Sequence, residues 1–207
     1  MPKCQIRQAN TNMERQETYK YLIARYRRSV KEGFYFEALM IAYAMQEDRL
    51  KSLLYYAGTF DNRNTIKVSK KTEKDLRFLL RKRYGEKERL VLTTITGKIK
   101  LLESLLFWSE TAIETECECN EYLISVKRLF ESVDIAALKE ILDNLQKWLE
   151  YRNEVIHASM NKNITGLYDN IENKVEQGME YARELDIHVK AIKKDNSVRK
   201  KLGMPNE

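Results

Sequence analysis

Residues 134–158, with the sequence DIAALKEILDNLQKWLEYRNEVIHA, carry the pattern of a long amphipathic helix. Apolar side chains recur every three or four positions, and Asp134 precedes them as a typical N-cap residue. On a helical wheel they form one continuous stripe, with charged side chains opposite. The stripe consists of Leu138, Ile141, Leu142, Leu145, Trp148, Leu149, Val155 and Ile156. We therefore expect a helix from Asp134 to about Ala158 that packs one face on a core.

The rest of the chain favours the same kind of structure. No proline occurs between Lys3 and Met204, and the 207 residues include only seven glycines. All-β folds need turn residues about every 8–12 positions, which this composition does not supply. Apolar periodicity predicts further helices at residues 12–31, 35–56, 92–106 and 167–194, a basic helix from Thr72, and one or two helices within 110–131. The expected fold class is all-α, a single-domain antiparallel helical bundle of about six to eight helices.

No composition shift marks a second folded unit. The expected organisation is an N-terminal extension (residues 1–13), a helical domain (residues 14–194) and a basic C-terminal tail (residues 195–207). The tail is predicted from the bases that cluster between Lys190 and Lys201.

Several classes of protein do not fit the sequence. No run approaches the roughly 20 apolar residues of a membrane span, and no signal peptide is visible, so the expected location is cytoplasmic. The chain has three cysteines, of which Cys117 and Cys119 form a C-x-C pair, and two histidines. These do not make a recognisable zinc site or disulfide framework, and there is no glycine-rich phosphate loop. We expect no metal and no cofactor.

Charge is distributed unevenly along the chain. The segment from Arg63 to Arg89 carries 11 basic and 4 acidic residues, whereas Glu103 to Glu154 carries 12 acidic and 5 basic residues. A basic segment favours an anionic partner, nucleic acid first. The RNA-binding candidates are Arg77, Arg81, Lys82 and Arg83. The alternative is that these bases are solvated helix faces that offset the acidic half.

The end of the 134–158 helix contains the motif Arg152-Asn153-Glu154-Val155-Ile156-His157. Arg152 falls in the middle of the apolar stripe, and Asn153 and His157 lie together at its edge. A guanidinium on a core-facing stripe is costly unless it is paired or meets a ligand or another subunit. Alternatively, Arg152 snorkels to solvent or pairs with a buried glutamate, and His157 complements the helix dipole.

The R-N-x-x-x-H spacing near the end of a long helix in an all-α chain resembles the signature of the HEPN superfamily (higher eukaryotes and prokaryotes nucleotide-binding). The resemblance implies a metal-independent endoribonuclease, usually a homodimer, whose motif helices meet across the two-fold axis. The implied catalytic residues are Arg152, Asn153 and His157. Cleavage would use the RNA 2′-OH as nucleophile and leave a 2′,3′-cyclic phosphate and a 5′-OH, with His157 as acid or base and Arg152 stabilising the developing charge.

One position departs from a toxin branch of this family. There a tyrosine stands two residues after the motif histidine and is modified by a nucleotidyltransferase antitoxin, whereas this chain has Ser159. Glu47 and Asp48, in the predicted 35–56 helix, are candidates to pair with Arg152, although they also fit the polar flank of an amphipathic helix. We treat His188 as a surface residue.

The leading interpretation is an HEPN-type endoribonuclease, as a toxin or an anti-phage defence effector acting on tRNA or mRNA. Such a protein implies a partner that restrains it, an antitoxin or another regulatory protein. We expect no association with a membrane, because no apolar run is long enough to span one. The alternatives are a non-catalytic helical dimerisation or interaction module and an RNA-binding bundle that does not cleave.

Overall fold

The computed structural model describes residues 12–62, 66–111, 121–161, 169–195 and 197–204, and within these ranges the chain forms eight helices and no strand. The all-α prediction is therefore confirmed. The only β-type pairing in these ranges is a single bridge between Phe60 and Val68. The helices are α1 (Asn12–Lys31), α2 (Tyr35–Tyr56), α3 (Glu73–Tyr84), α4 (Ile95–Glu110), α5 (Glu121–Glu131), α6 (Ile135–Asn161), α7 (Ile171–Lys194) and α8 (Ser197–Lys201).

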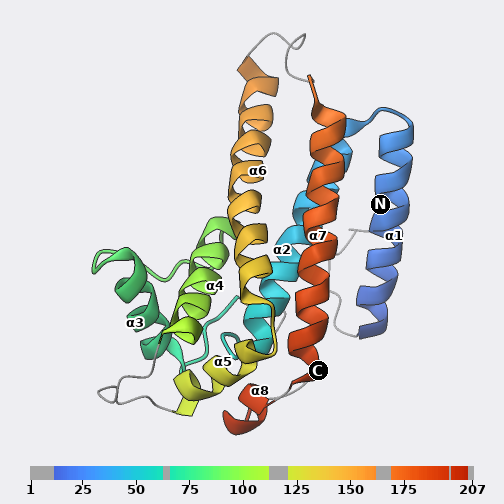
Figure 1. Ribbon diagram of the computed structural model, residues 1–207. Coiled ribbons are helices and arrows are strands. Elements are labelled where there is room, and N and C mark those ends of the chain that lie inside the picture. The colour runs from blue at the N-terminus through green and yellow to red at the C-terminus, as the bar shows by residue number, and fades with distance from the viewer. Residues whose placement is uncertain (1–11, 63–65, 112–120, 162–168, 196, 205–207) are drawn as a thin grey trace, which may run out of the picture.

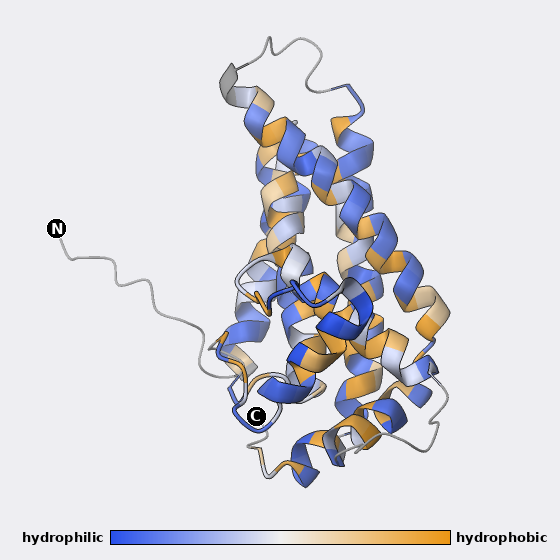
Figure 2. Ribbon diagram, turned by 90° about the vertical axis from the view of Figure 1, so that its left-hand side faces the viewer, coloured by the Kyte–Doolittle hydropathy of each residue, from blue (hydrophilic) through white to orange (hydrophobic). Residues whose placement is uncertain are grey.

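Helix α2 is the central element of the bundle. It lies behind α6 and α7 in Figure 1, with α1 on one side, α3 and α4 on the other, and α5 and α8 at the base. Its most extensive packing is against α7, and it also contacts α1 and α4. Most of its side chains are buried because three neighbours surround it. Hydrophobic and hydrophilic positions alternate along the outer helices, as their amphipathic pattern requires (Figure 2).

Helix α6 begins where the sequence predicts. The Asp134 side chain caps it by accepting a hydrogen bond from the Ala137 amide at 3.0 Å, as expected for an N-cap aspartate. The helix has 27 residues, about 40 Å, and its upper end extends beyond α4 in Figure 1.

A glycine allows α6 and α7 to approach closely. A Cβ at Gly178 would lie 2.4 Å from the Trp148 ring. The Trp148 indole donates to the Lys174 carbonyl at 2.7 Å. The Gly178 carbonyl accepts from the buried Gln46 amide of α2 at 2.7 Å. Three helices are thus fixed to one another at this point.

Side-chain contacts fix the register between α4 and α6, which run antiparallel. Lys139 pairs with Glu110, and seven residues further along α6 the Gln146 amide donates to Glu103 at 2.8 Å. Extending this register by five residues places Lys98 opposite Tyr151. Since α4 begins at Ile95, its N-terminal end lies at the level of Arg152.

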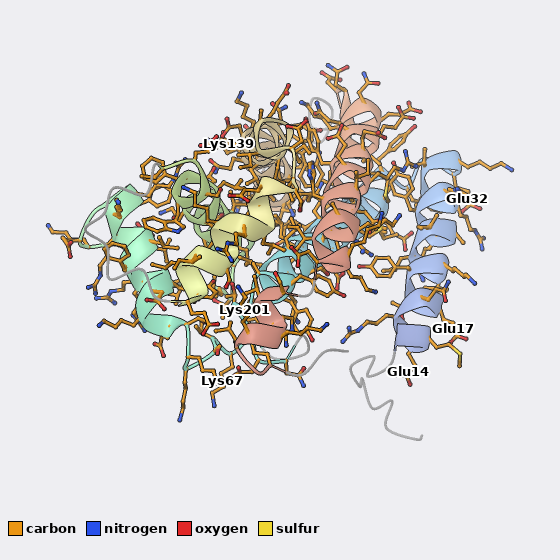
Figure 3. The ribbon with its side chains drawn as sticks, turned by 60° about the horizontal axis from the view of Figure 1, so that its bottom comes forward. Glu14, Glu17, Glu32, Lys67, Lys139 and Lys201 are labelled. Atoms are coloured by element: carbon orange, nitrogen blue, oxygen red, sulfur yellow. The ribbon has the colours of Figure 1, made fainter. Side chains whose placement is uncertain are left out.

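The C-terminal segment is anchored to the bundle instead of extending from it. Val198, Arg199 and Met204 are buried, and α8 packs on α5. Residues 197–204, part of the predicted tail, therefore complete the core at the base. The lysines of this segment, Lys200 and Lys201, are exposed. Lys201 lies at this base in Figure 3, whereas Glu14, Glu17 and Glu32 lie along α1.

The bounds of α1 and α2 agree with the periodicity, whereas α4 begins three residues later than predicted, because Thr94 caps it by accepting a hydrogen bond from the Gly97 amide. Helix α7 also begins later, at Ile171 instead of Leu167. Residues 1–11, 112–120 and 162–168 lie outside the described ranges, and with them Cys4, Cys117 and Cys119. The prediction that His188 is a surface residue is wrong: its side chain is 8% exposed. Burial lowers its pKa, and the negative charge of Asp134 partly opposes that shift. None of the described helices combines the length and the apolar character that crossing a membrane requires.

Candidate functional site

The side chain of Arg152 lies on the ring of Tyr43, between α6 and α2. Its guanidinium carbon is 4.1 Å from the ring centroid, a cation–π stack. One terminal nitrogen donates to Asn153 Oδ1 at 3.0 Å, and the other lies 3.5 Å from Met40 Sδ. Among the described residues, the buried Nε has no hydrogen-bond partner. Three side chains therefore hold the guanidinium in place without satisfying all of its donors.

No carboxylate in the described part of the chain forms an ion pair with Arg152. A guanidinium has five N–H donors, and only two of its nitrogens are engaged, one of them by a weak sulfur acceptor. The site therefore suits an anion with several acceptor oxygens, such as a phosphate group. Burial raises the pKa of the Tyr43 phenol, as does the charge of Glu47, while the charge of Arg152 opposes the shift.

The two acidic residues proposed to support Arg152 have other partners. Glu47 accepts from the Lys98 ammonium at 2.7 Å, and Lys98 is fully buried in α4. Asp48 points to the other side of α2, where it accepts from the Tyr19 hydroxyl of α1. The structure thus places Glu47 close to the site, one turn from Tyr43, and Asp48 away from it. Neither carboxylate neutralises Arg152.

His157 and Asn153 are exposed on the upper half of α6. Arg152 and His157 are separated by about 140° around the helix axis and about 7.5 Å along it. The side chain of Asn153 lies between them in angle and contacts Arg152 directly. A single copy of α6 therefore directs Arg152 toward α2 and His157 away from it.

Apolar side chains are exposed next to Arg152 on α2. Phe36 is 41% exposed and Met40 is 36% exposed. With Tyr43 they occupy one helix face, at spacings of four and three residues. We call Phe36, Met40, Tyr43 and Arg152 the open face. Phe36 and Met40 are exposed there because α4 begins only at the level of Arg152, as the α4–α6 register shows.

The predicted RNA-binding residues divide into two groups on α3. Arg77, Arg81 and Lys82 line one hollow of 680 Å³, together with Lys74, Phe78 and Glu86. Arg83 lies outside this lining, with its guanidinium 5.4 Å from the Tyr84 centroid and 5.6 Å from that of Phe107. The structure therefore brings three of the four candidates together and separates the fourth.

Sequence reasoning missed three residues around Arg152: Met40, Tyr43 and Lys98. Lys98 had a usable signal, because it interrupts the apolar series Ile95, Ile99 and Leu102 as Arg152 interrupts the stripe of α6. Tyr43 and Met40 had no such signal, since aromatic and methionine side chains on an apolar helix are most simply read as core. Among the described residues no group of three or more potential metal ligands occurs.

Comparisons with protein-family models, with curated proteins and with solved structures found no match for this chain. The features of this chain that bear on function are the surroundings of Arg152 and the α3 hollow.

Proposed function

We propose that this protein is an endoribonuclease of the HEPN type, with Arg152, Asn153 and His157 as its catalytic residues. The observation that carries the proposal is the state of Arg152, whose guanidinium is stacked on Tyr43. Within the described ranges its buried Nε has no hydrogen-bond partner, and no carboxylate forms an ion pair with it. Such a group binds a phosphodiester and stabilises the additional negative charge of the phosphorane.

The chemistry transfers the phosphorus from one oxygen of the RNA to another. The 2′-oxygen attacks the adjacent phosphorus as its proton passes to a base, and the bond to the 5′-oxygen breaks as an acid donates a proton to it. A histidine fills either role at neutral pH. The products are a 2′,3′-cyclic phosphate and a 5′-OH, and no step needs a metal. Asn153 positions the guanidinium through its amide oxygen.

We propose that the working form is a homodimer, with the site built from both copies. Arg152 and His157 diverge by about 140° on one helix, so a second α6 across a two-fold axis is the direct way to bring a histidine to the arginine. The exposed Phe36 and Met40 supply apolar surface at that position. The exposed surface at Phe36 and Met40 would also suit the alternative, a dimerisation module without catalysis. A test for RNA cleavage distinguishes the nuclease from that module.

The first experiment measures cleavage of RNA in EDTA. We expect 2′,3′-cyclic phosphate ends, and no cleavage where the substrate carries 2′-O-methyl groups. His157→Ala should lose roughly 10²–10⁴-fold in rate, the range of general acid–base catalysis. Arg152→Lys should lose most activity, because it keeps the charge but not the planar fork. The matched control is Arg183→Lys, an exposed arginine on α7. Full activity of His157→Ala, or loss of activity in EDTA, contradicts the mechanism.

The second experiment tests the shared site. Equal amounts of Arg152→Ala and His157→Ala subunits, allowed to exchange, should regain roughly a quarter of the wild-type rate, because half the dimers then hold one intact composite site. A site contained in one chain regains nothing. Phe36→Glu should give a monomer by sedimentation and no cleavage, while Ile187→Glu, which changes an exposed residue on α7, should alter neither property.

We propose a toxin or anti-phage effector that cuts tRNA or mRNA, held in check by an antitoxin or another regulatory protein. Growth arrest on induction of the wild-type chain, absent for His157→Ala, is the expected result. If RNA binds but stays uncut by the purified protein, the RNA-binding bundle is the correct alternative.

A further inference from the structure

The hollow on α3 combines positive charge with an exposed aromatic ring. It has a volume of 680 Å³, and its lining is Lys74, Arg77, Phe78, Arg81, Lys82 and Glu86. All six residues come from α3 and the residues just after it. Lys74, Phe78 and Lys82 follow one another at four-residue spacing, as do Arg77 and Arg81, so both rows share one side of the helix.

The cations of this hollow differ in what they already contact. Arg77 pairs with Glu73 at 2.7 Å. The Lys82 ammonium lies 6.0 Å from the Phe78 centroid and 5.2 Å from that of Trp108. Lys74 and Arg81 form no ion pair within the described ranges, and both are exposed. Four cations against Glu86 make the hollow basic, and two of them are available to phosphate groups.

Phe78 does not serve the core of the bundle. It is 43% exposed, whereas Leu76, Leu79 and Leu80 supply the buried side of α3. The ring of Phe78 lies among four cations and is partly exposed to water. A polar residue would be expected at this position if the helix face were only solvated. An aromatic ring beside phosphate-binding cations is the arrangement by which proteins hold unpaired bases.

We infer that the α3 hollow is a binding site for a single-stranded segment of RNA, in which one base stacks on Phe78 and the flanking phosphates contact Lys74 and Arg81. The inference rests on the proposed function only for the choice of RNA as the ligand. Paired bases in a duplex are already stacked, so their faces do not reach the ring. The carboxylates of an acidic protein segment would satisfy the cations but would leave the ring of Phe78 without a stacking partner.

This site is separate from the proposed catalytic centre. Lys82 contacts Trp108 near the end of α4, ten residues beyond Lys98, which lies opposite Tyr151. That is about 15 Å along the axis of α4. The α3 site therefore holds a part of the RNA other than the phosphodiester at Arg152, and selects substrates with unpaired nucleotides.

The test measures binding of the full-length protein to a 2′-O-methyl oligouridylate, which the proposed reaction cannot cut. Phe78→Ala should weaken binding roughly 5- to 150-fold, the range for losing one base stack, and Phe78→Tyr should retain it. The matched control is Phe107→Ala, because Phe107 is 38% exposed on α4 but lies outside the hollow. It should bind normally.

Two further measurements separate stacking from charge. Arg81→Glu should reduce the slope of log affinity against log salt by roughly 0.7 or more, since it removes a phosphate contact on a single strand. Phe78→Ala should leave that slope unchanged. A fully paired hairpin of the same length should bind wild type and Phe78→Ala equally.

Three results would overturn the inference. The first is unchanged oligouridylate binding by Phe78→Ala, and the second is an equal loss for single strand and duplex. The third is an acidic peptide that competes as well as RNA and whose affinity also depends on Phe78, since the hollow then binds protein. None of these results depends on cleavage. If RNA stays uncut but its binding still depends on Phe78, only the proposed nuclease activity is refuted. If RNA is cleaved but its binding does not depend on Phe78, only the α3 site is refuted.

Discussion

Two arginines, one at the base of the bundle and one at its upper end, are both stacked on tyrosines and have opposite surroundings. At the base, the Arg199 guanidinium lies 3.6 Å from the Tyr55 centroid and donates to the carbonyls of Tyr55, Phe60 and Asp61 at 2.8–3.1 Å. At the upper end, Arg152 lies 4.1 Å from the Tyr43 centroid, and its Nε has no partner in the part of the chain that the structure describes.

The difference lies in which groups satisfy the donors. Arg199 is fully buried, and its guanidinium donates to backbone carbonyl oxygens. It therefore fixes α8 to the end of α2 and is a structural residue. Arg152 is held by side chains that leave donors available, which is the condition for binding an anion. The two histidines differ in burial in the same direction: His188 is buried at the base, and His157 is exposed at the upper end.

Removing the base arginine tests the structural half of the comparison. Arg199→Met should lower the free energy of unfolding by at least about 3 kcal/mol, because three carbonyls lose hydrogen bonds from a charged donor. Urea unfolding followed by circular dichroism measures this loss. Arg199→Lys, which keeps the charge but cannot reach all three carbonyls, should recover only part of it. A loss of unfolding free energy below about 1 kcal/mol would contradict a structural role for Arg199.

The Lys98–Glu47 pair shows that the upper region can also satisfy a buried cation. Glu47→Ala should cost about 2 kcal/mol, less than for a fully buried pair because Glu47 remains partly exposed to water. Lys98→Met, which removes the charge while filling the same space, should be nearly neutral. The matched control is Glu73→Ala, which breaks the exposed pair with Arg77 and should cost well under 1 kcal/mol. Equal losses in Glu47→Ala and Glu73→Ala would refute the distinction.

Removing the upper arginine should have little effect on stability. Arg152→Met loses a cation–π contact of about 0.5–1 kcal/mol but relieves the unsatisfied Nε, so the urea midpoint should stay close to that of wild type. The same variant should abolish cleavage. A loss as large as that of Arg199→Met would make Arg152 a structural residue too.

The smallest expected effect is a pH dependence at the base. Burial holds the pKa of His188 below its usual 6.5, so the unfolded chain binds a proton more readily than the native one. The contribution to stability is complete above about pH 6.5 and is lost as the pH falls below that value, toward the lowered native pKa. His188→Gln should flatten unfolding free energy against pH between pH 5 and 7. An unchanged slope would show that another group titrates.

Helix positions were readable from the sequence because they depend on local periodicity. Residues 12–31 and 35–56 were predicted with the bounds of α1 and α2, and Asp134 as the cap of α6. The unusual position of Arg152 could also be predicted from the sequence, since the helical wheel of one helix shows a charge within an apolar stripe. Its partners were not, because Tyr43 and Met40 are more than a hundred residues away in sequence.

The sequence by itself determined that this chain is helical, where its long helices lie, and that Arg152 breaks the pattern of its helix, since each of these is a property of neighbouring residues. Only the tertiary structure decided that Glu47 neutralises Lys98 instead of Arg152 and that Arg199 closes the base. It also decided that Phe78 stands in a basic hollow while Arg83 lies elsewhere. The reason is physical: whether a charge is satisfied depends on groups from other helices, and packing chooses those neighbours.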